Sequence, residues 1–345
     1  MRVILVGDFR HDRLGASYQR AFLGLGHEVK TFDVTEQSLA LAWWVRERIP
    51  HRLTIRSIHA RRAGAIGYNG RLLELCAQWR PDLILAFNGD FVMPETIRTI
   101  RSKGVRFCIF HADNPFPPHY NNRPETLDGA KECDVYFIWS EAVAQRLRSL
   151  GIKARFLAFA WDSEVFPYRG PPGDQPYDVS FIGGWDPERE ELLNAIAEEF
   201  QLNIWGPEYW GSRTRKSSPS RHCWRGRELG GAEAANVIAK SKIMINPLRR
   251  QHYTDDQADG VIMRTFEVPG TGGFLLSTRA TGALEIFPEG EAAAYYADLK
   301  ECCDRIEYYL ANDAERSKVA GLAHRLVERE HQYSHRVNEL LRELG

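Results

Sequence analysis

The chain has 345 residues, which exceeds what one hydrophobic core usually serves, so two domains of ordinary size are expected. Its hydrophobic fraction of 43% and charged fraction of 26% are typical of a water-soluble globular protein, not of a disordered or membrane-embedded chain. The net charge of -1 gives no reason to expect nucleic acid as a dedicated partner.

Six cysteines are spread along the chain without a Cys-x-x-Cys pair, and no spacing with histidines suggests a zinc site. We therefore expect reduced, mostly buried thiols in a cytoplasmic protein. The opening run from Met1 to Gly7 is too short for the core of a signal peptide. No run approaches the roughly 20 apolar residues that a membrane-spanning helix needs.

The first half of the chain predicts alternating strands and helices. Short apolar runs predict buried strands at Val3–Val6, Glu28–Phe32, Leu83–Phe87, Arg106–Phe110, Val135–Trp139 and Arg155–Leu157. Helical patterns separate them, for example near 94–103 and 141–149. A repeated strand–helix order predicts a parallel, doubly wound sheet.

A polar loop follows the first strand and runs from Gly7 and Asp8 to Gly15. Its glycines lack the close Gly-x-Gly-x-x-Gly spacing, so NAD binding is not predicted. The loop would still lie at the carboxyl edge of a central strand, where open α/β sheets bind ligands. Gly7, Asp8 and Gly15 are therefore candidates for contact with a donor or an acceptor.

A later strand end carries His111-Ala112-Asp113-Asn114-Pro115. Because such strand ends face the ligand side of the sheet, His111 and Asp113 are candidate catalytic residues for proton transfer or for binding substrate hydroxyls. The alternative role is turn formation, since Asp and Asn before proline are common turn residues.

Residues 39–62 combine tryptophans with six arginines. One interpretation is a surface for an anionic acceptor or for peripheral membrane contact, where Trp and Arg are both favoured. The other, which we favour, is a pair of helices with solvated basic faces and buried tryptophans.

The segment Gly170-Pro-Pro-Gly-Asp-Gln-Pro176 breaks regular structure and predicts a linker at 166–177. It separates an N-terminal domain at 1–165 from a second domain at 178–330, and a terminal helix follows at 331–345. Strands of the second domain are expected at Val179–Ile182, Leu202–Trp205, Ile243–Asn246, Phe274–Leu276 and Ala293–Tyr296. Two successive α/β domains of similar size imply a cleft between them.

In the second domain, a predicted short helix carries Arg264 and Glu267 three residues apart on one face. A glycine-rich break at 269–273 and a buried strand come next. The planar guanidinium suits phosphate oxygens, while the carboxylate accepts hydrogen bonds from a ribose diol. Taken alone, the pair is better explained as a surface ion pair beside a helix end, so the context must decide.

Several motifs together resemble one family: Val6-Gly7-Asp8, Phe110-His-Ala-Asp113-Asn-Pro115, Ser180-Phe-Ile-Gly183-Gly184 with Arg189, Ile245-Asn246-Pro247, and Arg264-Thr-Phe-Glu267-Val-Pro-Gly-Thr-Gly-Gly-Phe-Leu-Leu276. The chain resembles a GT-B glycosyltransferase of the CgeB-like, spore-maturation-type branch, and its second domain is similar to glycosyltransferase families 1 and 4. The last motif is the most specific, and the resemblance covers nearly the whole chain. It implies two Rossmann-like doubly wound domains facing each other across a cleft, with the terminal helix crossing back to the first.

The resemblance implies that Glu267 holds the donor ribose and that Arg264 lies near the diphosphate. Gly183 and Gly184 would let backbone N–H groups and a helix N-terminus approach the phosphates. Arg189 is a second candidate phosphate clamp.

The other donor-binding residues implied in the same way are Trp224, Gly226, Asn246, Gly272 and Gly273. The first two lie where such domains present backbone to the base. Asp259 stands eight positions before Glu267, at a place where many GT-B enzymes carry a glutamate, and it is a candidate for either donor or acceptor contact. Its shorter side chain reaches less far than a glutamate would.

The function implied is transfer of a sugar from a nucleotide-diphosphate sugar, with a UDP-sugar as the expected co-substrate, to a glycan, lipid-linked, protein or modified nucleic acid acceptor. No oligomeric state is indicated. The resemblance implies a retaining outcome, and the lack of a clear Asp-x-Asp motif predicts a metal-independent reaction without a metal site or a further cofactor. The alternatives are a GT-B epimerase or hydrolase acting on the same donor, and a non-catalytic nucleotide-sugar-binding protein.

Overall fold

The computed structural model describes residues 1–34, 54–89, 92–116, 124–170, 173–254 and 257–345. They form two compact units, one of Met1–Leu157 with Val337–Gly345 and one of Ala158–Arg336. Most of the basic and tryptophan-rich patch at 39–62 lies outside the described residues. The two interpretations of that patch both stay predictions.

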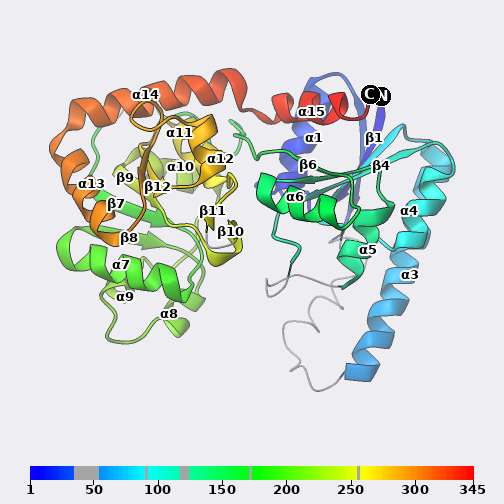
Figure 1. The fold of residues 1–345 in the computed structure, drawn as a ribbon, viewed down its shortest axis with the longest axis horizontal. Coiled ribbons are helices and arrows are strands. Elements are labelled where there is room, and N and C mark those ends of the chain that lie inside the picture. Colours follow the sequence, from blue (N-terminus) through cyan, green and yellow to red (C-terminus); the bar gives the residue numbers. More distant parts are fainter. Residues whose placement is uncertain (35–53, 90–91, 117–123, 171–172, 255–256) are drawn as a thin grey trace. The chain divides into compact units, whose positions relative to one another are not determined.

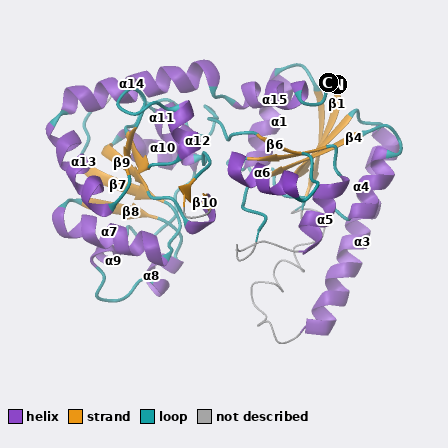
Figure 2. Ribbon diagram, viewed as in Figure 1, coloured by secondary structure: helices purple, strands orange, loops and turns teal. Residues whose placement is uncertain are grey.

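The described part of the first unit contains a parallel six-stranded sheet in the order β2-β1-β3-β4-β5-β6 (Figures 1 and 2). Its strands are β1 (Arg2–Gly7), β2 (Glu28–Asp33), β3 (Leu83–Phe87), β4 (Arg106–His111), β5 (Val135–Ile138) and β6 (Ala154–Phe156). Its helices are α1 (Leu14–Gly24), α3 (Thr54–Trp79), α4 (Pro94–Arg101), α5 (Pro124–Glu132) and α6 (Glu141–Ser149). The central strands are apolar runs buried on both faces, as expected for a parallel sheet between helices.

The second unit has a parallel five-stranded sheet among its described residues, in the order β13-β12-β9-β7-β8. The strands are β7 (Tyr177–Ile182), β8 (Leu202–Trp205), β9 (Ser241–Asn246), β12 (Leu275–Thr278) and β13 (Ala294–Tyr296). The helices are α7 (Pro187–Glu199), α8 (Tyr209–Arg213), α9 (Pro219–Cys223), α10 (Gly231–Ala239), α11 (Arg264–Thr271), α12 (Thr281–Ile286), α13 (Leu299–Ala311) and α14 (Asp313–Glu330). After β9, a 3-10 turn (Arg250–His252) leads into a small hairpin of β10 (Tyr253–Thr254) and β11 (Gln257–Ala258).

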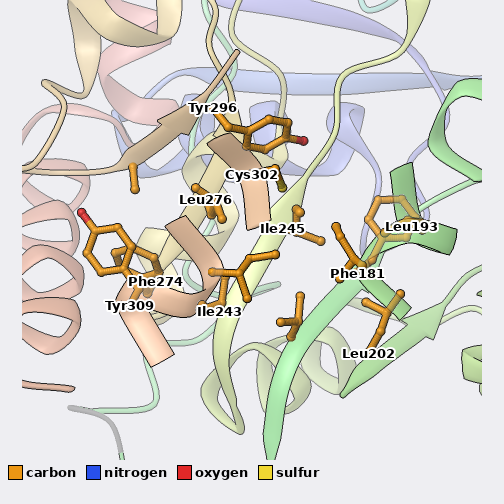
Figure 3. Close-up of a cluster of buried hydrophobic side chains, with 14 of the residues drawn as sticks. Phe181, Leu193, Leu202, Ile243, Ile245, Phe274, Leu276, Tyr296, Cys302 and Tyr309 are labelled. Atoms are coloured by element: carbon orange, nitrogen blue, oxygen red, sulfur yellow. The ribbon is translucent and has the colours of Figure 1, made fainter. Parts of the chain in front are cut away.

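Alternating strand residues build a core on each face of this second sheet. On one face Phe181, Ile243 and Leu276 pack with Leu193 of α7 and Cys302 of α13 (Figure 3). The opposite face is made by the intervening residues, and it packs against α10 and α11. Both faces are thus covered by helices, and α11 is fixed directly on the sheet.

The second unit begins at Ala158, before the linker predicted at 166–177. Hydrogen bonds explain the difference, because Trp161 N donates to His331 O at 2.8 Å and Arg169 N donates to Thr271 O at 3.1 Å. At the other end of the unit, α15 (Tyr333–Arg342) follows α14, and the residues from Val337 onward belong to the first unit.

All six cysteines lie in the described part of the chain and are free. Cys223 and Cys303 are half-buried, and the other four are buried. Among the described residues, no helix combines the length and the apolar character needed to cross a membrane.

Candidate functional site

The chain of the second unit changes direction between β7 and β9, which are neighbours in its sheet. From β7 it passes through α7 to β8 on one side, and it then returns to place β9 on the other side. In open α/β sheets, ligands bind outside the carboxyl ends of the strands at such a point. The backbone there consists of Gly183-Gly184 after β7 and Asn246-Pro247 after β9.

Arg189 joins these two strand ends. Its Nε and Nη2 donate to the carbonyl of Pro247 at 2.9 and 2.7 Å, and its Nη1 donates to the carbonyl of Gly184 at 3.1 Å. The residue is only 6% exposed, and burial, together with the charge of Arg249, lowers the pKa of its guanidinium to about 9. These hydrogen bonds to backbone carbonyls place Arg189 to position the Gly184 turn. This role differs from the predicted role of Arg189 as a phosphate clamp.

The residues just before Arg189 explain why α7 begins where it does. Asp186 caps α7, because its side chain accepts a hydrogen bond from the Arg189 N–H at 3.0 Å, and Pro187 occupies the first turn. The helix therefore starts immediately after the Gly183-Gly184 turn.

Arg264 and Glu267 form an ion pair at the start of α11, in which Glu267 is buried and Arg264 is half-buried. Arg264 Nη1 lies 2.8 Å from Glu267 Oε2, and their side chains are 20% and 7% exposed. Burial raises the pKa of the Glu267 carboxyl, and the charge of Arg264 opposes that rise. Arg264 is also close enough to Arg189 for its charge to lower the pKa of that residue. The surface ion pair that the isolated motif also allowed is therefore wrong.

The helix that carries this pair is longer than predicted. Instead of breaking at Pro269, α11 continues to Thr271 and ends at Gly272, whose φ of 97° lies in the left-handed region. The proline is tolerated because it costs one backbone hydrogen bond near the end of a short helix whose residues from Thr265 to Thr271 are all buried.

Gly272 and Gly273 therefore have structural explanations. Gly272 supplies the left-handed C-cap, where a side chain would be strained. A Cβ on Gly273 would overlap Ile238 of α10. Both glycines fit helix packing, and their predicted contact with a donor stays a prediction.

The segment around Trp224 runs beside β8. Trp224 pairs with Ile204, and its indole N–H donates to the carbonyl of Gly206 at 3.1 Å. Gly226 has a φ of 82°, and among the described residues no atom would lie within 4 Å of a Cβ placed on it. The space beside Gly226 is thus open, as the predicted contact with a base requires.

Asn246 and Asp259 occupy different places near the end of β9. Asn246 is buried, and its amide donates to the hydroxyl of Ser277 at 3.0 Å, which ties β9 to β12. Asp259 follows β11, and its backbone N–H donates to His252 O at 2.9 Å. Asn246 therefore forms part of the buried sheet edge below the candidate site, while Asp259 belongs to the hairpin of β10 and β11.

Arg249 is a candidate site residue that no sequence motif indicated. A Cβ on Gly184 would overlap its guanidinium, and Arg249 Nε lies 3.6 Å from Asp186 Oδ2. The side chain is 35% exposed. Together with Arg189 and Arg264, it makes the region around the turn rich in cations.

In the first unit, the loop after β1 is held by its own charges. The Asp8 carboxylate accepts hydrogen bonds from Arg10 and lies 3.7 Å from Arg13 Nε. A Cβ on Gly15 would lie 2.6 Å from the Asp8 carbonyl, and one on Gly7 would lie 2.9 Å from the Phe87 ring. The two glycines thus permit close packing, and Asp8 remains at the carboxyl edge of the sheet.

His111 and Asp113 differ in accessibility. His111 is 1% exposed, its Nδ1 lies 3.2 Å from the carbonyl of Asn88, and its ring stacks on Tyr136. Asp113 is half-buried. Asn88 itself adopts a φ of 62° and accepts a hydrogen bond from Ala112 N, which links the ends of β3 and β4. His111 is thus built into the strand ends, and Asp113 is the more accessible of the two.

The structure brings Gly184, Arg189, Arg264 and Glu267 into one region of the second unit, whereas Gly7, Asp8, Gly15, His111 and Asp113 belong to the first unit. Among the described residues, no group of three or more His, Cys, Asp or Glu is placed so that it could hold a metal ion.

Comparisons with known proteins bear on the fold and on the second unit. Residues 189–342 match a family model described as glycosyl transferase-like. No curated protein matches the chain. Among solved structures, sucrose-phosphate synthase from Thermosynechococcus elongatus is similar with a TM-score of 0.66 and 11% identity, over 100% of this chain and 99% of that chain.

Two further structures are similar over nearly their whole lengths. HepE from Anabaena in complex with UDP has a TM-score of 0.64 and 11% identity, over 100% of this chain and 99% of that chain, and the same protein was also solved with UDP-glucose. A putative UDP-N-acetylglucosamine 2-epimerase from Listeria monocytogenes has a TM-score of 0.55 and 13% identity, over 99% of this chain and 95% of that chain. The predicted GT-B fold with two Rossmann-like domains is confirmed, and the match to the glycosyl transferase-like family model lies mostly in the second unit.

Proposed function

We propose that this chain is a glycosyltransferase that takes a sugar from a nucleotide-diphosphate sugar and transfers it to an acceptor in a metal-independent, retaining reaction. The observation that carries the proposal is the ion pair between half-buried Arg264 and buried Glu267, which lies within the glycosyl transferase-like region and beside a cationic strand end. The narrower CgeB-like assignment and the cytoplasmic location stay predictions.

The charge distribution of the second unit suits the departure of a nucleotide diphosphate. Breaking the bond between sugar and diphosphate leaves negative charge on the phosphate oxygens, so fixed cations near those oxygens lower the barrier. Arg264 and Arg249 are partly exposed and can meet an anion, whereas Arg189 is committed to the backbone. The charge of the leaving group would then be balanced by guanidinium groups without a metal ion.

Glu267 is assigned to the ribose. Its carboxylate has more acceptor positions than its contact with Arg264 uses, and a ribose diol donates two hydrogen bonds. Those donors would favour the ionised form, against the burial that raises the pKa of the carboxyl. The ion pair with Arg264 would keep the carboxylate oriented when the site is empty.

The acceptor side is assigned to the first unit. Asp113, half-buried at the carboxyl end of β4, is the group we propose for proton transfer or for binding an acceptor hydroxyl. His111 is enclosed and bonded to Asn88, so we propose that it supports the loop that carries Asp113.

The test of transfer is an assay of nucleotide release. The protein would be incubated with UDP-, GDP-, dTDP- and CDP-sugars, with and without glycans, lipid-linked saccharides and peptides as acceptors. A UDP-sugar comes first because the similar HepE structures contain UDP or UDP-glucose. Nucleotide release that depends on an acceptor supports transfer. Donor isomerisation without an acceptor would indicate an epimerase, and binding without turnover would indicate a non-catalytic protein.

The test of the donor site is a pair of substitutions, Glu267→Ala and Arg264→Ala. Each removes a charged hydrogen bond worth about 1.5–3 kcal/mol, so we expect UDP to bind about 10–100-fold more weakly in calorimetry. Asp304→Ala is a matched control, since it opens an exposed ion pair with Lys300 elsewhere on the same unit. UDP affinity that is unchanged in both site variants would refute this donor site.

A further inference from the structure

The space beside Gly184 is filled by side chains from two other segments. A Cβ on this residue would overlap the guanidinium of Arg249 and would lie 2.6 Å from the hydroxyl of Tyr209. No positive φ is involved, so backbone strain is not the reason for a glycine here. The absence of a side chain at 184 instead makes room for a cation supplied by the strand end of β9.

The ion pair that Arg249 makes in this position is incomplete. Arg249 Nε lies 3.6 Å from Asp186 Oδ2, which is too far for a hydrogen bond. Within the described part of the chain, these two atoms are buried and neither makes a hydrogen bond. A buried donor and a buried carboxylate oxygen left unsatisfied cost free energy, which a ligand that completes the donor's hydrogen bonds would recover.

Local electrostatics favour an anion as that ligand. The guanidinium groups of Arg189, Arg249 and Arg264 are offset by the carboxylates of Asp186 and Glu267. The mutual repulsion of the arginines is strong enough for Arg249 to lower the pKa of Arg189. A diphosphate would remove this repulsion, whereas a neutral ligand would not.

The main chain at Arg249 is fixed by the turn that follows it. Its N–H donates to His252 Nδ1 at 3.0 Å, and its carbonyl accepts from His252 N at 2.8 Å. The side chain is 35% exposed, and its acidic partner is Asp186. A change of partner at the guanidinium therefore requires rotation of the side chain and leaves the turn intact.

We propose that Arg249 is a phosphate ligand of the donor site and that Asp186 is its resting partner, displaced when a diphosphate binds. In the empty site, Asp186 keeps the guanidinium over Gly184, and in the loaded site phosphate oxygens take the hydrogen bonds of Nε and the Nη atoms. Arg189 holds the Gly184 turn, beside which phosphate replaces Asp186 as the partner of Arg249. The inference rests on the proposed function, because it assigns residues within the same donor site.

The first test measures calorimetric binding of UDP and of inorganic pyrophosphate. We expect Arg249→Gln to weaken both about 10–100-fold, as expected for loss of a charged hydrogen-bonding group. Arg250→Gln is the matched control, since the neighbouring guanidinium lies over the Tyr253 ring at 5.6 Å, and it should change neither affinity more than about 2-fold. Equal affinities in Arg249→Gln and wild type would overturn the assignment while leaving the proposed function intact.

The second test asks whether Gly184 acts through Arg249. Gly184→Ala should displace the flexible guanidinium at small cost in stability and weaken UDP binding about as much as Arg249→Gln. The double variant should then bind no more weakly than either single variant, because both remove the same contact. Additive losses would show that Gly184 acts on the ligand independently and would overturn this part of the proposal.

The third test concerns Asp186. Asp186→Asn keeps an oxygen that can cap α7 but removes the charge that competes with phosphate. We expect it to tighten pyrophosphate and UDP binding about 2–5-fold, the range of a partly exposed ion pair. Weaker or equal binding in this variant would refute the exchange. Failure of the wild type to bind either probe would refute the inference and the proposed function together.

Discussion

The contact between Gly270 and Trp161 provides a sharp test of how the site helix is held. Gly270 lies near the end of α11, and a Cβ placed on it would lie 2.6 Å from the Trp161 indole nitrogen and closer still to two carbons of the ring. Trp161 is 4% exposed, and its Nε1 donates to the carbonyl of Phe166 at 2.7 Å. The ring cannot move aside freely, so Gly270→Ala must displace either Trp161 or α11.

The magnitude follows from three contributions. Overpacking a filled core costs about 1–3 kcal/mol, and disturbing the indole hydrogen bond adds about 1 kcal/mol. Replacing glycine by alanine within a helix gains about 1 kcal/mol. We therefore expect Gly270→Ala to lower the free energy of unfolding by about 1–3 kcal/mol, which corresponds to a fall in Tm of at least about 2 °C for a unit of this size.

The measurement is thermal and urea unfolding alongside Gly321→Ala as a matched control. Gly321 lies within α14 of the same unit, and a Cβ there would meet Arg325 Nη1 at an ordinary distance of 3.6 Å. This control should gain up to about 1 kcal/mol. Because α11 also carries Glu267, Gly270→Ala should weaken UDP binding as well. Equal or higher stability of Gly270→Ala than of Gly321→Ala would refute the packing argument.

Three other predictions use burial and charge. Arg189→Lys should lower the free energy of unfolding by about 1.5–3 kcal/mol in urea titrations, because a lysine cannot reach both carbonyl groups; an unchanged midpoint would contradict the bridging role. Burial lowers the pKa of His331 to about 4, so its contribution to stability is present above its unfolded pKa of about 6.5 and is lost as the pH falls through 4. Unfolding curves of His331→Gln should therefore lose less stability than wild type between pH 6.5 and 4, and parallel curves would contradict this. Burial raises the pKa of Cys76 to about 11, and Cys108, Cys133 and Cys302 are buried as well, so mass spectrometry after brief N-ethylmaleimide treatment at pH 8 should find Cys223 and Cys303 modified before these four thiols.

Most strands could be predicted from the sequence because a strand buried on both faces needs a continuous apolar run. Leu83–Phe87 and Leu202–Trp205 have the bounds that their apolar runs predict. The end of α11 could not be located in the same way. Pro269 and Gly270 usually end helices, but burial against the sheet and the close approach of Trp161 keep both inside this one.

The candidate site was predictable where a local pattern determines the contact. Arg264 and Glu267 lie one helical turn apart, so their spacing alone predicts the ion pair. The partners of Arg189 were not predictable, since the carbonyl of Pro247 lies 58 residues away and a backbone acceptor leaves no trace in the side-chain pattern. An arginine near a turn at the end of a strand can therefore hold the turn instead of a ligand.

Arg249 and Arg250 show how fine this distinction becomes. The two adjacent residues have the same chemistry, yet one guanidinium lies against Gly184 and the other over the ring of Tyr253. The 3-10 turn closed by His252 separates them, because it fixes the backbone from which each side chain departs. After β7, Gly184 leaves the space that the guanidinium of Arg249 fills. Gly184 follows a strand at the point where the sheet changes direction, and its φ is not positive. Its lack of a side chain is therefore explained by a cation from the end of the neighbouring strand.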